Sequence, residues 1–215
     1  MREYVEKLER SPGVAQQQAL LDRIIADPTL HARLVNTFAR MEYVGVRKIL
    51  KSRRSETLDL DGLQHMLDET VHALRLKKGA LALAGDPARV ATFSGADTLA
   101  GDAGEGYLQE VDQAAEAALA GVSSEGRTDL NYVLTSAAIE IRAQAFYPMY
   151  EARLRAAGAG LSVAAIVRDE DRHLAEMAER LEAALPDWRA RLAPVLDREA
   201  AAFARFFQEV AAQVG

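Results

Sequence analysis

Apolar residues recur at helical spacing along most of the chain. Val35, Phe38 and Val46 fall on one face of a helix, and Phe203 and Val210 do so near the other end of the chain. No segment shows the alternating pattern of a β-strand. The pattern therefore predicts an all-α protein. We expect helices over residues 14–26, 28–53, 61–84, 107–120, 128–157, 162–185 and 187–213.

Proline and glycine mark the ends of these segments. Pro28 suits the first turn of a helix, where its missing N–H would be unpaired in any case. Thr128 or Asp129 is expected to cap the helix that follows them. Pro148 lies inside that helix and predicts a kink, because it removes one backbone hydrogen bond. Residues 85–104 are rich in Gly, Asp and Ala without a period, which predicts a long loop.

Composition and charge narrow the functional classes. With 49% hydrophobic and 27% charged residues in 215, the chain is typical of one soluble globular domain spanning 1–215. The net charge of −6 disfavours a nucleic-acid partner. The absence of cysteine excludes a disulfide framework, a rubredoxin-type centre and a thiol nucleophile within this sequence. The charged start "MREYVEKLERSPG" and the lack of a long apolar run predict a cytoplasmic protein without a membrane span.

Two five-residue segments repeat one pattern. "DETVH" occupies residues 68–72 and "DEDRH" occupies residues 169–173, in a chain with only four histidines. On a helix, Glu69 and His72 share a face because they are three residues apart, and so do Glu170 and His173. Each glutamate interrupts an otherwise apolar stripe.

Two further glutamates, Glu42 and Glu140, also interrupt apolar stripes. A carboxylate in a core is costly unless it is neutralised, paired or bound to a metal, and no lysine or arginine lies on these stripes. Glu42 precedes Glu69 by 27 residues and Glu140 precedes Glu170 by 30, so antiparallel packing of successive helices brings the members of the first pair level. The second pair fits less well, because the predicted helix over 128–157 extends beyond its partner unless Pro148 bends the excess away.

A glutamate on one helix followed by Glu-x-x-His on the next, occurring twice, is the dimetal pattern of four-helix bundles. Over residues 28–185 the chain resembles the ferritin-like di-iron-carboxylate superfamily. The resemblance implies a bundle with a long crossover at 85–127, additional N- and C-terminal helices, the latter at 187–213, and two metal ions, with iron favoured over manganese or a mixed pair. It implies the metal ligands Glu42, Glu69, His72, Glu140, Glu170 and His173.

The resemblance implies an oxidase or oxygenase that activates O₂ for a small organic substrate and takes electrons from a separate donor. Alternatives are a ferroxidase or iron-storage protein and a peroxide-reducing protein of the rubrerythrin kind. The helices beyond the bundle favour the enzyme, since they can enclose a pocket. "AAIEIRAQAF" and "RDEDRHL" also loosely resemble the tRNA-hydroxylase and aldehyde-oxygenase branches, although the acidic charge counts against a tRNA substrate.

The two aspartates of the repeats are expected to act on the histidines. A histidine that binds metal through one ring nitrogen needs an acceptor for the N–H on the other nitrogen. Asp68 and Asp169 lie about 100° around each helix from the ligand glutamates and can face the neighbouring helix. We predict cross-pairing, in which Asp68 accepts from His173 and Asp169 accepts from His72.

Four other features have ordinary interpretations. His65, one turn before Glu69, is expected to be a hydrogen-bonded core residue, with a place beside the metal ligands or in a pocket wall as the alternative. His31 is expected at the surface. Tyr147 is expected to pack in the core, with the wall of a substrate or oxygen pocket as the alternative. The phenylalanines of 203–207 are expected to cover the bundle, with a homodimer interface as the alternative.

Overall fold

The computed structural model describes residues 1–53, 55–56 and 58–215. In these residues the chain is all-helical, as predicted, with no strand. The helices are α1 (Arg2–Glu9), α2 (Val14–Ala26), α3 (Pro28–Ser52), α4 (Leu60–Leu83), α5 (Gly101–Ala118), α6 (Arg127–Ala156), α7 (Ala164–Ala184) and α8 (Trp188–Val214), with a 3₁₀ turn η1 (Pro87–Val90) between α4 and α5.

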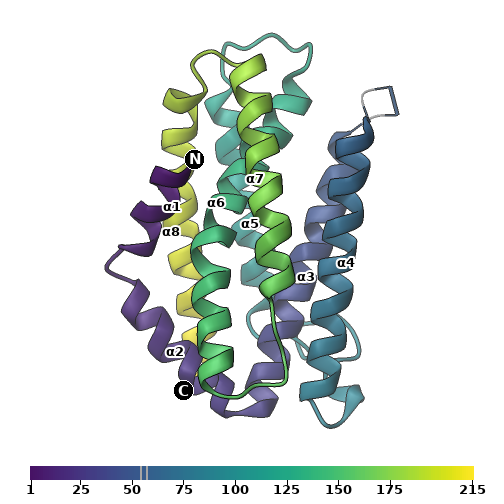
Figure 1. Cartoon of the computed structure of the whole chain (residues 1–215), viewed down its shortest axis with the longest axis vertical. Coiled ribbons are helices and arrows are strands. Elements are labelled where there is room, and N and C mark those ends of the chain that lie inside the picture. Colours follow the sequence, from purple (N-terminus) through teal and green to yellow (C-terminus); the bar gives the residue numbers. More distant parts are fainter. Residues whose placement is uncertain (54, 57) are drawn as a thin grey trace.

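Two helix pairs form the centre of the molecule. Helices α3 and α4 pack against each other along their length, and so do α6 and α7 (Figure 1). Helix α5 connects the first pair to the second and packs against α3, α6 and α8. Helices α1, α2 and α8 also contact α6. Because α6 is surrounded in this way, it buries residues on nearly every side.

Several boundaries follow directly from local chemistry. The side chain of Asp27 accepts from the backbone N–H groups of Thr29 at 2.8 Å and Leu30 at 3.1 Å, with Pro28 at the first helical position. This start of α3 was predicted. The predicted cap of α6 is wrong, because Gly126, at φ 74°, precedes the helix and no side chain caps it. Helix α6 continues through Pro148 to Ala156.

The segment predicted as a loop over 85–104 is partly helical. It contains η1, and α5 begins at Gly101, several residues before the predicted start. The turn into α5 is tight, since Ala100 has φ 56° and a Cβ at position 101 would lie 2.3 Å from Thr98 Oγ1. This turn packs against α3, where the N–H of Leu99 donates to Thr37 Oγ1 at 2.9 Å. The spacing of apolar residues in the sequence does not predict such a contact.

Two further expectations about burial have opposite outcomes. The aromatic cluster of α8 covers the bundle as predicted, because Phe203 and Phe207 are buried with ring centroids 5.8 and 5.5 Å from that of Phe146. The surface position expected for His31 is wrong. Its ring is 1% exposed and Nε2 lies 2.7 Å from the hydroxyl of Tyr150, and burial lowers its pKa to about 4. Among the described residues, every helix is too short or too polar to span a lipid bilayer.

Candidate metal centre

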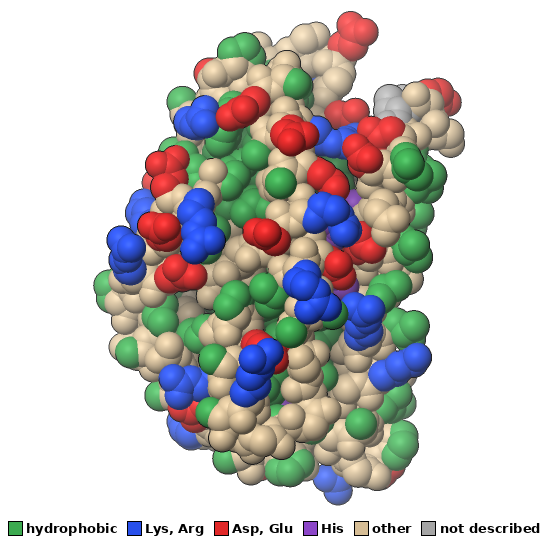
Figure 2. Space-filling model, viewed as in Figure 1, with side chains coloured by type: hydrophobic (Ala, Val, Ile, Leu, Met, Phe, Trp, Pro, Cys, Tyr) green, Lys and Arg blue, Asp and Glu red, His purple; other side chains and the backbone are tan. Residues whose placement is uncertain are grey.

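The six predicted ligands come together between the two helix pairs. Glu42 comes from α3, Glu69 and His72 from α4, Glu140 from α6, and Glu170 and His173 from α7. Both histidines are fully buried, and the glutamates are buried except Glu42, which is half-buried. On the face formed by α4 and α7, histidine atoms show only as small areas among charged side chains (Figure 2). The polypeptide therefore screens the imidazoles from solvent on this face.

The side chains form two groups that share one carboxylate. Within each group, one donor atom from every residue lies within 4.8 Å of the others. We call them the Glu42 group and the Glu140 group, and Glu69 belongs to both. The Glu42 group is Glu42, Glu69, His72 and Glu170, and the Glu140 group is His65, Glu69, Glu140 and His173. Each group could hold a metal ion.

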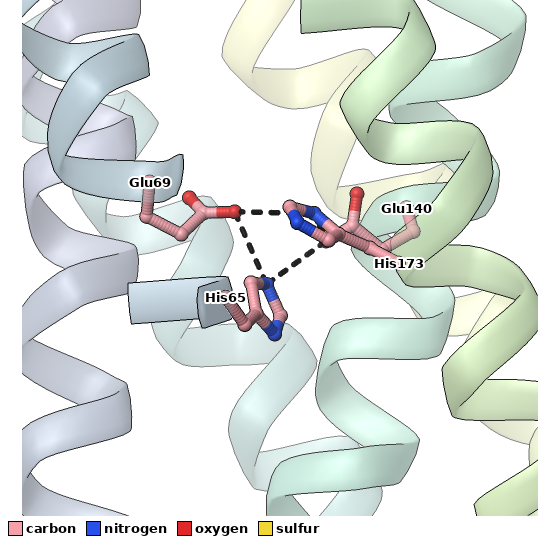
Figure 3. Close-up of side chains that lie close together, drawn as sticks. All are labelled: His65, Glu69, Glu140 and His173. Atoms are coloured by element: carbon pink, nitrogen blue, oxygen red, sulfur yellow. Dashed lines mark hydrogen bonds and ion pairs between the residues drawn. The ribbon is translucent and has the colours of Figure 1, made fainter. Parts of the chain in front are cut away.

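The Glu140 group surrounds a common point (Figure 3). His65 Nε2 lies 3.2 Å from Glu69 Oε1 and 3.5 Å from Glu140 Oε1. His173 Nδ1 lies 3.8 Å from Glu69 Oε1 and 3.7 Å from Glu140 Oε1. On the far side of the His65 ring, Nδ1 lies 2.6 Å from the hydroxyl of Tyr132. Two nitrogens and two carboxylates thus point inward together.

The Glu42 group contains a nitrogen without a hydrogen bond. His72 Nδ1 is buried and has no hydrogen-bond partner in the described part of the chain, although Glu170 Oε1 lies 3.2 Å away. The carboxylate of Glu42 accepts from the hydroxyl of Tyr147 at 2.5 Å. Gly45 allows α3 to approach, since a Cβ there would lie 3.0 Å from Glu69 Oε2. Once it has released any proton that it carries, this inward nitrogen offers the lone pair that a metal ligand requires.

Both predicted cross-pairs between the repeats are present. His72 Nε2 lies 3.1 Å from Asp169 Oδ2, and His173 Nε2 lies 3.2 Å from Asp68 Oδ2. Asp68 also accepts from Arg172, which holds its carboxylate in place. An N–H at Nε2 donates to each aspartate, so Nδ1 of each ring faces the carboxylates, and that of His173 lies 2.8 Å from Glu170 Oε2.

The pKa values of the side chains in the centre reflect its buried negative charge. Burial, together with the charges of neighbouring carboxylates, raises the pKa of Glu42 and of Glu140 well above the ordinary value. Burial alone would lower the pKa of His72, but the contact with Glu170 and the surrounding carboxylates outweigh it and raise that pKa to about 10. The metal-free centre therefore retains protons, and a metal cation could replace them.

The donor chemistry fits divalent transition metals. Imidazole nitrogens and carboxylate oxygens together suit iron, manganese and zinc, whereas a site of oxygen donors alone would suit calcium or magnesium. Divalent cations bound here would offset the negative charge of the four carboxylates and so reduce the cost of holding them in the interior. The unpaired Nδ1 of His72 and the protons retained on Glu42 and Glu140 agree with this fit.

An apolar cavity of about 180 Å³ adjoins the centre. Glu42, Glu140 and Glu170 form one part of its wall. The rest of the wall comes from α3, α5, α6 and α8 and is mostly apolar, with Phe38, Met41, Val44, Ile139, Phe146 and Phe206 among its residues. We call it the α5 cavity, because the connecting helix α5 supplies part of its wall. A small molecule inside it would lie against the carboxylates.

His65 and Tyr132 were not predicted to belong to the centre. His65 is the buried, hydrogen-bonded residue that we expected, and it is also a member of the Glu140 group. Its position one turn before Glu69 was the available signal, since residues four apart share a helix face. Tyr147 packs against Phe38 as expected, and in addition it donates to Glu42.

Comparisons of the chain with known protein families, with curated proteins and with solved structures gave no match. The geometry of the centre therefore has to support any functional conclusion without the help of a relative.

Proposed function

We propose that this protein holds two metal ions. Residues of the Glu42 group would hold one and residues of the Glu140 group the other, and Glu69 belongs to both groups. The observation that carries the proposal is the arrangement of three buried histidines. Each presents one nitrogen to the carboxylates, while the other nitrogen meets Asp169, Asp68 or Tyr132. Outer partners of this kind fix the tautomer of metal-binding histidines and raise their basicity.

The order of the ligands supports a ferritin-like four-helix bundle. Helices α3 and α6 each supply one glutamate, and α4 and α7 each supply Glu-x-x-His, with α5 as the crossover between the halves. In this proposal His65 is a seventh ligand, beyond the six that the family resemblance implies.

The activity that we propose is oxidation or oxygenation of a small organic substrate with O₂. When bound, a pair of iron ions supplies open coordination positions and the redox chemistry that O₂ activation requires; manganese or a mixed pair could serve similarly. Oxygenation of a C–H bond puts one oxygen atom of O₂ into the product and reduces the other to water, which consumes two electrons and two protons. The chain has no cysteine to hold an iron–sulfur centre, so a separate electron donor supplies them.

The chain's own residues position and shield the reaction. The Tyr147 hydroxyl holds the Glu42 carboxylate at one orientation, and Asp68 and Asp169 hold the imidazoles. The apolar wall of the α5 cavity limits water beside the centre. This apolar wall favours an organic substrate over Fe(II) as the substrate, because Fe(II) ions would need a path lined by polar side chains to reach the centre.

A stoichiometric reaction with O₂ tests the proposal. Protein loaded anaerobically with Fe(II) should retain about two irons per chain, consume O₂ on mixing and form no mineral. The Glu140→Gln variant should lose iron, because it removes one carboxylate of the Glu140 group, whereas the exposed Glu125→Gln variant should behave as the original protein.

Three other results would change the proposal. Retention of far less than one iron per chain would reject the metal centre. Accumulation of hundreds of irons per chain as a mineral would support iron storage instead. Faster oxidation by H₂O₂ than by O₂ would support a peroxide-reducing protein.

A further inference from the structure

Most polar groups on the wall of the α5 cavity already have partners. The hydroxyl of Tyr107 donates to Glu199 at 2.9 Å, and the guanidinium of Arg142 makes two hydrogen bonds of 2.8 Å to the same carboxylate. Lys48 Nζ donates to Asp112 at 2.5 Å. Both cations on the wall are therefore balanced by a carboxylate, and neither is free to attract an anionic ligand.

Thr135 is different. Its side chain lines the cavity and the residue is only 3% exposed, yet Oγ1 has no hydrogen-bond partner within residues 1–53, 55–56 and 58–215. Buried hydroxyl groups in folded proteins nearly always have a partner, because an unpaired one costs free energy. Thr135 belongs to α6, one turn before Ile139 and two turns before Arg142, all of which line the same wall. Thr135 thus belongs to the wall that continues toward Glu140 of the metal centre. Its oxygen is buried, and a rotation about the Cα–Cβ bond would turn the hydroxyl toward the cavity.

We propose that the α5 cavity binds a neutral molecule about the size of an aromatic ring, and that its hydroxyl or carbonyl group makes a hydrogen bond with Thr135. An apolar protein cavity of roughly 150 Å³ binds benzene, so about 180 Å³ suits a ring with one small substituent. Such a molecule satisfies Thr135 at one place and fills apolar surface elsewhere. That this ligand is the substrate rests on the proposed function.

A pair of probes of similar shape isolates the hydrogen bond. Benzyl alcohol and ethylbenzene differ mainly in a hydroxyl in place of a methyl group. Titrations followed by ¹H–¹⁵N NMR would give both dissociation constants, and the shifts should concentrate on residues of α5, α6 and α8 that line the cavity. In Thr135→Val, which keeps the shape of the side chain, the affinity for benzyl alcohol relative to ethylbenzene should fall about five-fold, equivalent to about 1 kcal/mol for one hydrogen bond.

A matched control is available on the same helix. Thr128 is exposed at the start of α6, so Thr128→Val should leave the affinity ratio unchanged. The proposal is overturned if neither probe shifts the cavity residues, or if Thr135→Val leaves the ratio as it was. Thr135→Val should fold normally, because it removes a hydroxyl that has no partner in the protein.

The metal content of the same samples separates this inference from the proposed function. If the protein binds both probes with the expected ratios but holds no metal, the ligand site is supported and the dimetal function is rejected. If the protein holds two metals but binds neither probe, the ligand site is rejected and the dimetal centre is supported.

Discussion

In the metal-free protein, the free energy of unfolding should fall as pH rises. In the folded, metal-free protein the pKa values of Glu42 and Glu140 lie above the ordinary value of 4.5, and that of His72 is about 10 against an ordinary 6.5. The folded state therefore keeps protons that the unfolded chain has already released. Stability is lost above about pH 4.5 for the glutamates, and between pH 6.5 and 10 for His72.

The opposite effect of Glu170 lies outside the neutral range. Burial alone would raise its pKa, but the hydrogen bond with His173 and the contact with His72 outweigh burial and lower the pKa below 4.5. Its contribution to stability is therefore lost only as the solution becomes acidic, and it is constant between pH 6.5 and 8.5. The slope in that range is set by Glu42, Glu140, His72 and His173, because the contact with Glu170 also raises the pKa of His173.

Each group that differs in protonation changes the free energy of unfolding by up to about 1.4 kcal/mol per pH unit. A single such group would lower the stability by roughly 2–3 kcal/mol between pH 6.5 and 8.5. For a chain of 215 residues this corresponds to a fall in Tm of roughly 5–10 °C. Metal binding should reverse the trend, because the ligands bind in their deprotonated forms and affinity rises with pH.

Thermal unfolding of chelated and metal-loaded protein across this pH range measures the effect. The difference in Tm between the two should widen as pH rises. Glu42→Gln should flatten the slope of the metal-free protein, since it removes one titrating carboxyl, and the exposed Glu125→Gln should not. A Tm of the metal-free protein that stays constant or rises from pH 6.5 to 8.5 would refute this reasoning.

Two further substitutions test particular contacts. Asp68→Ala removes the acceptor of His173 and should weaken metal retention about 10- to 100-fold in competition with a chelator. The control Asp171→Ala changes an exposed residue and should have no effect. Equal losses in both variants would contradict the role of Asp68. Glu199→Leu leaves the buried charge of Arg142 unpaired and should lower the free energy of unfolding, measured with denaturant, by about 3–5 kcal/mol. The double variant Arg142→Met/Glu199→Leu should recover most of this loss. A double variant as unstable as the single one would show that packing, not charge, explains the loss.

The helices were predictable because the signals that define them are local. The 3.6-residue period and the place of Pro28 in the first turn of α3 depend only on neighbouring residues, and the structure agrees with both. Helix α1 was not predicted, because it is short and mostly charged and buries only Val5, so it depends on packing against α6. The early start of α5 at Gly101 likewise depends on contacts with α3.

The convergence of the glutamates was predictable for a different reason. A carboxylate inside an apolar stripe is visible in one sequence, and helix length then indicates which carboxylates lie level. Whether a histidine beside such a stripe faces inward or outward depends on the neighbouring helices, which explains the wrong surface position expected for His31. The α5 cavity and Thr135 could not be predicted, because they depend on how α5 and α8 lie over α6.

Anomalous diffraction from crystals of the metal-loaded protein, recorded on both sides of the iron and manganese absorption edges, tests the dimetal centre most directly. We expect two metal positions. One should be bound by Glu42, His72 and Glu170, the other by His65, Glu140 and His173, and Glu69 should contact both. A single metal position, none, or positions away from these side chains would contradict the proposal.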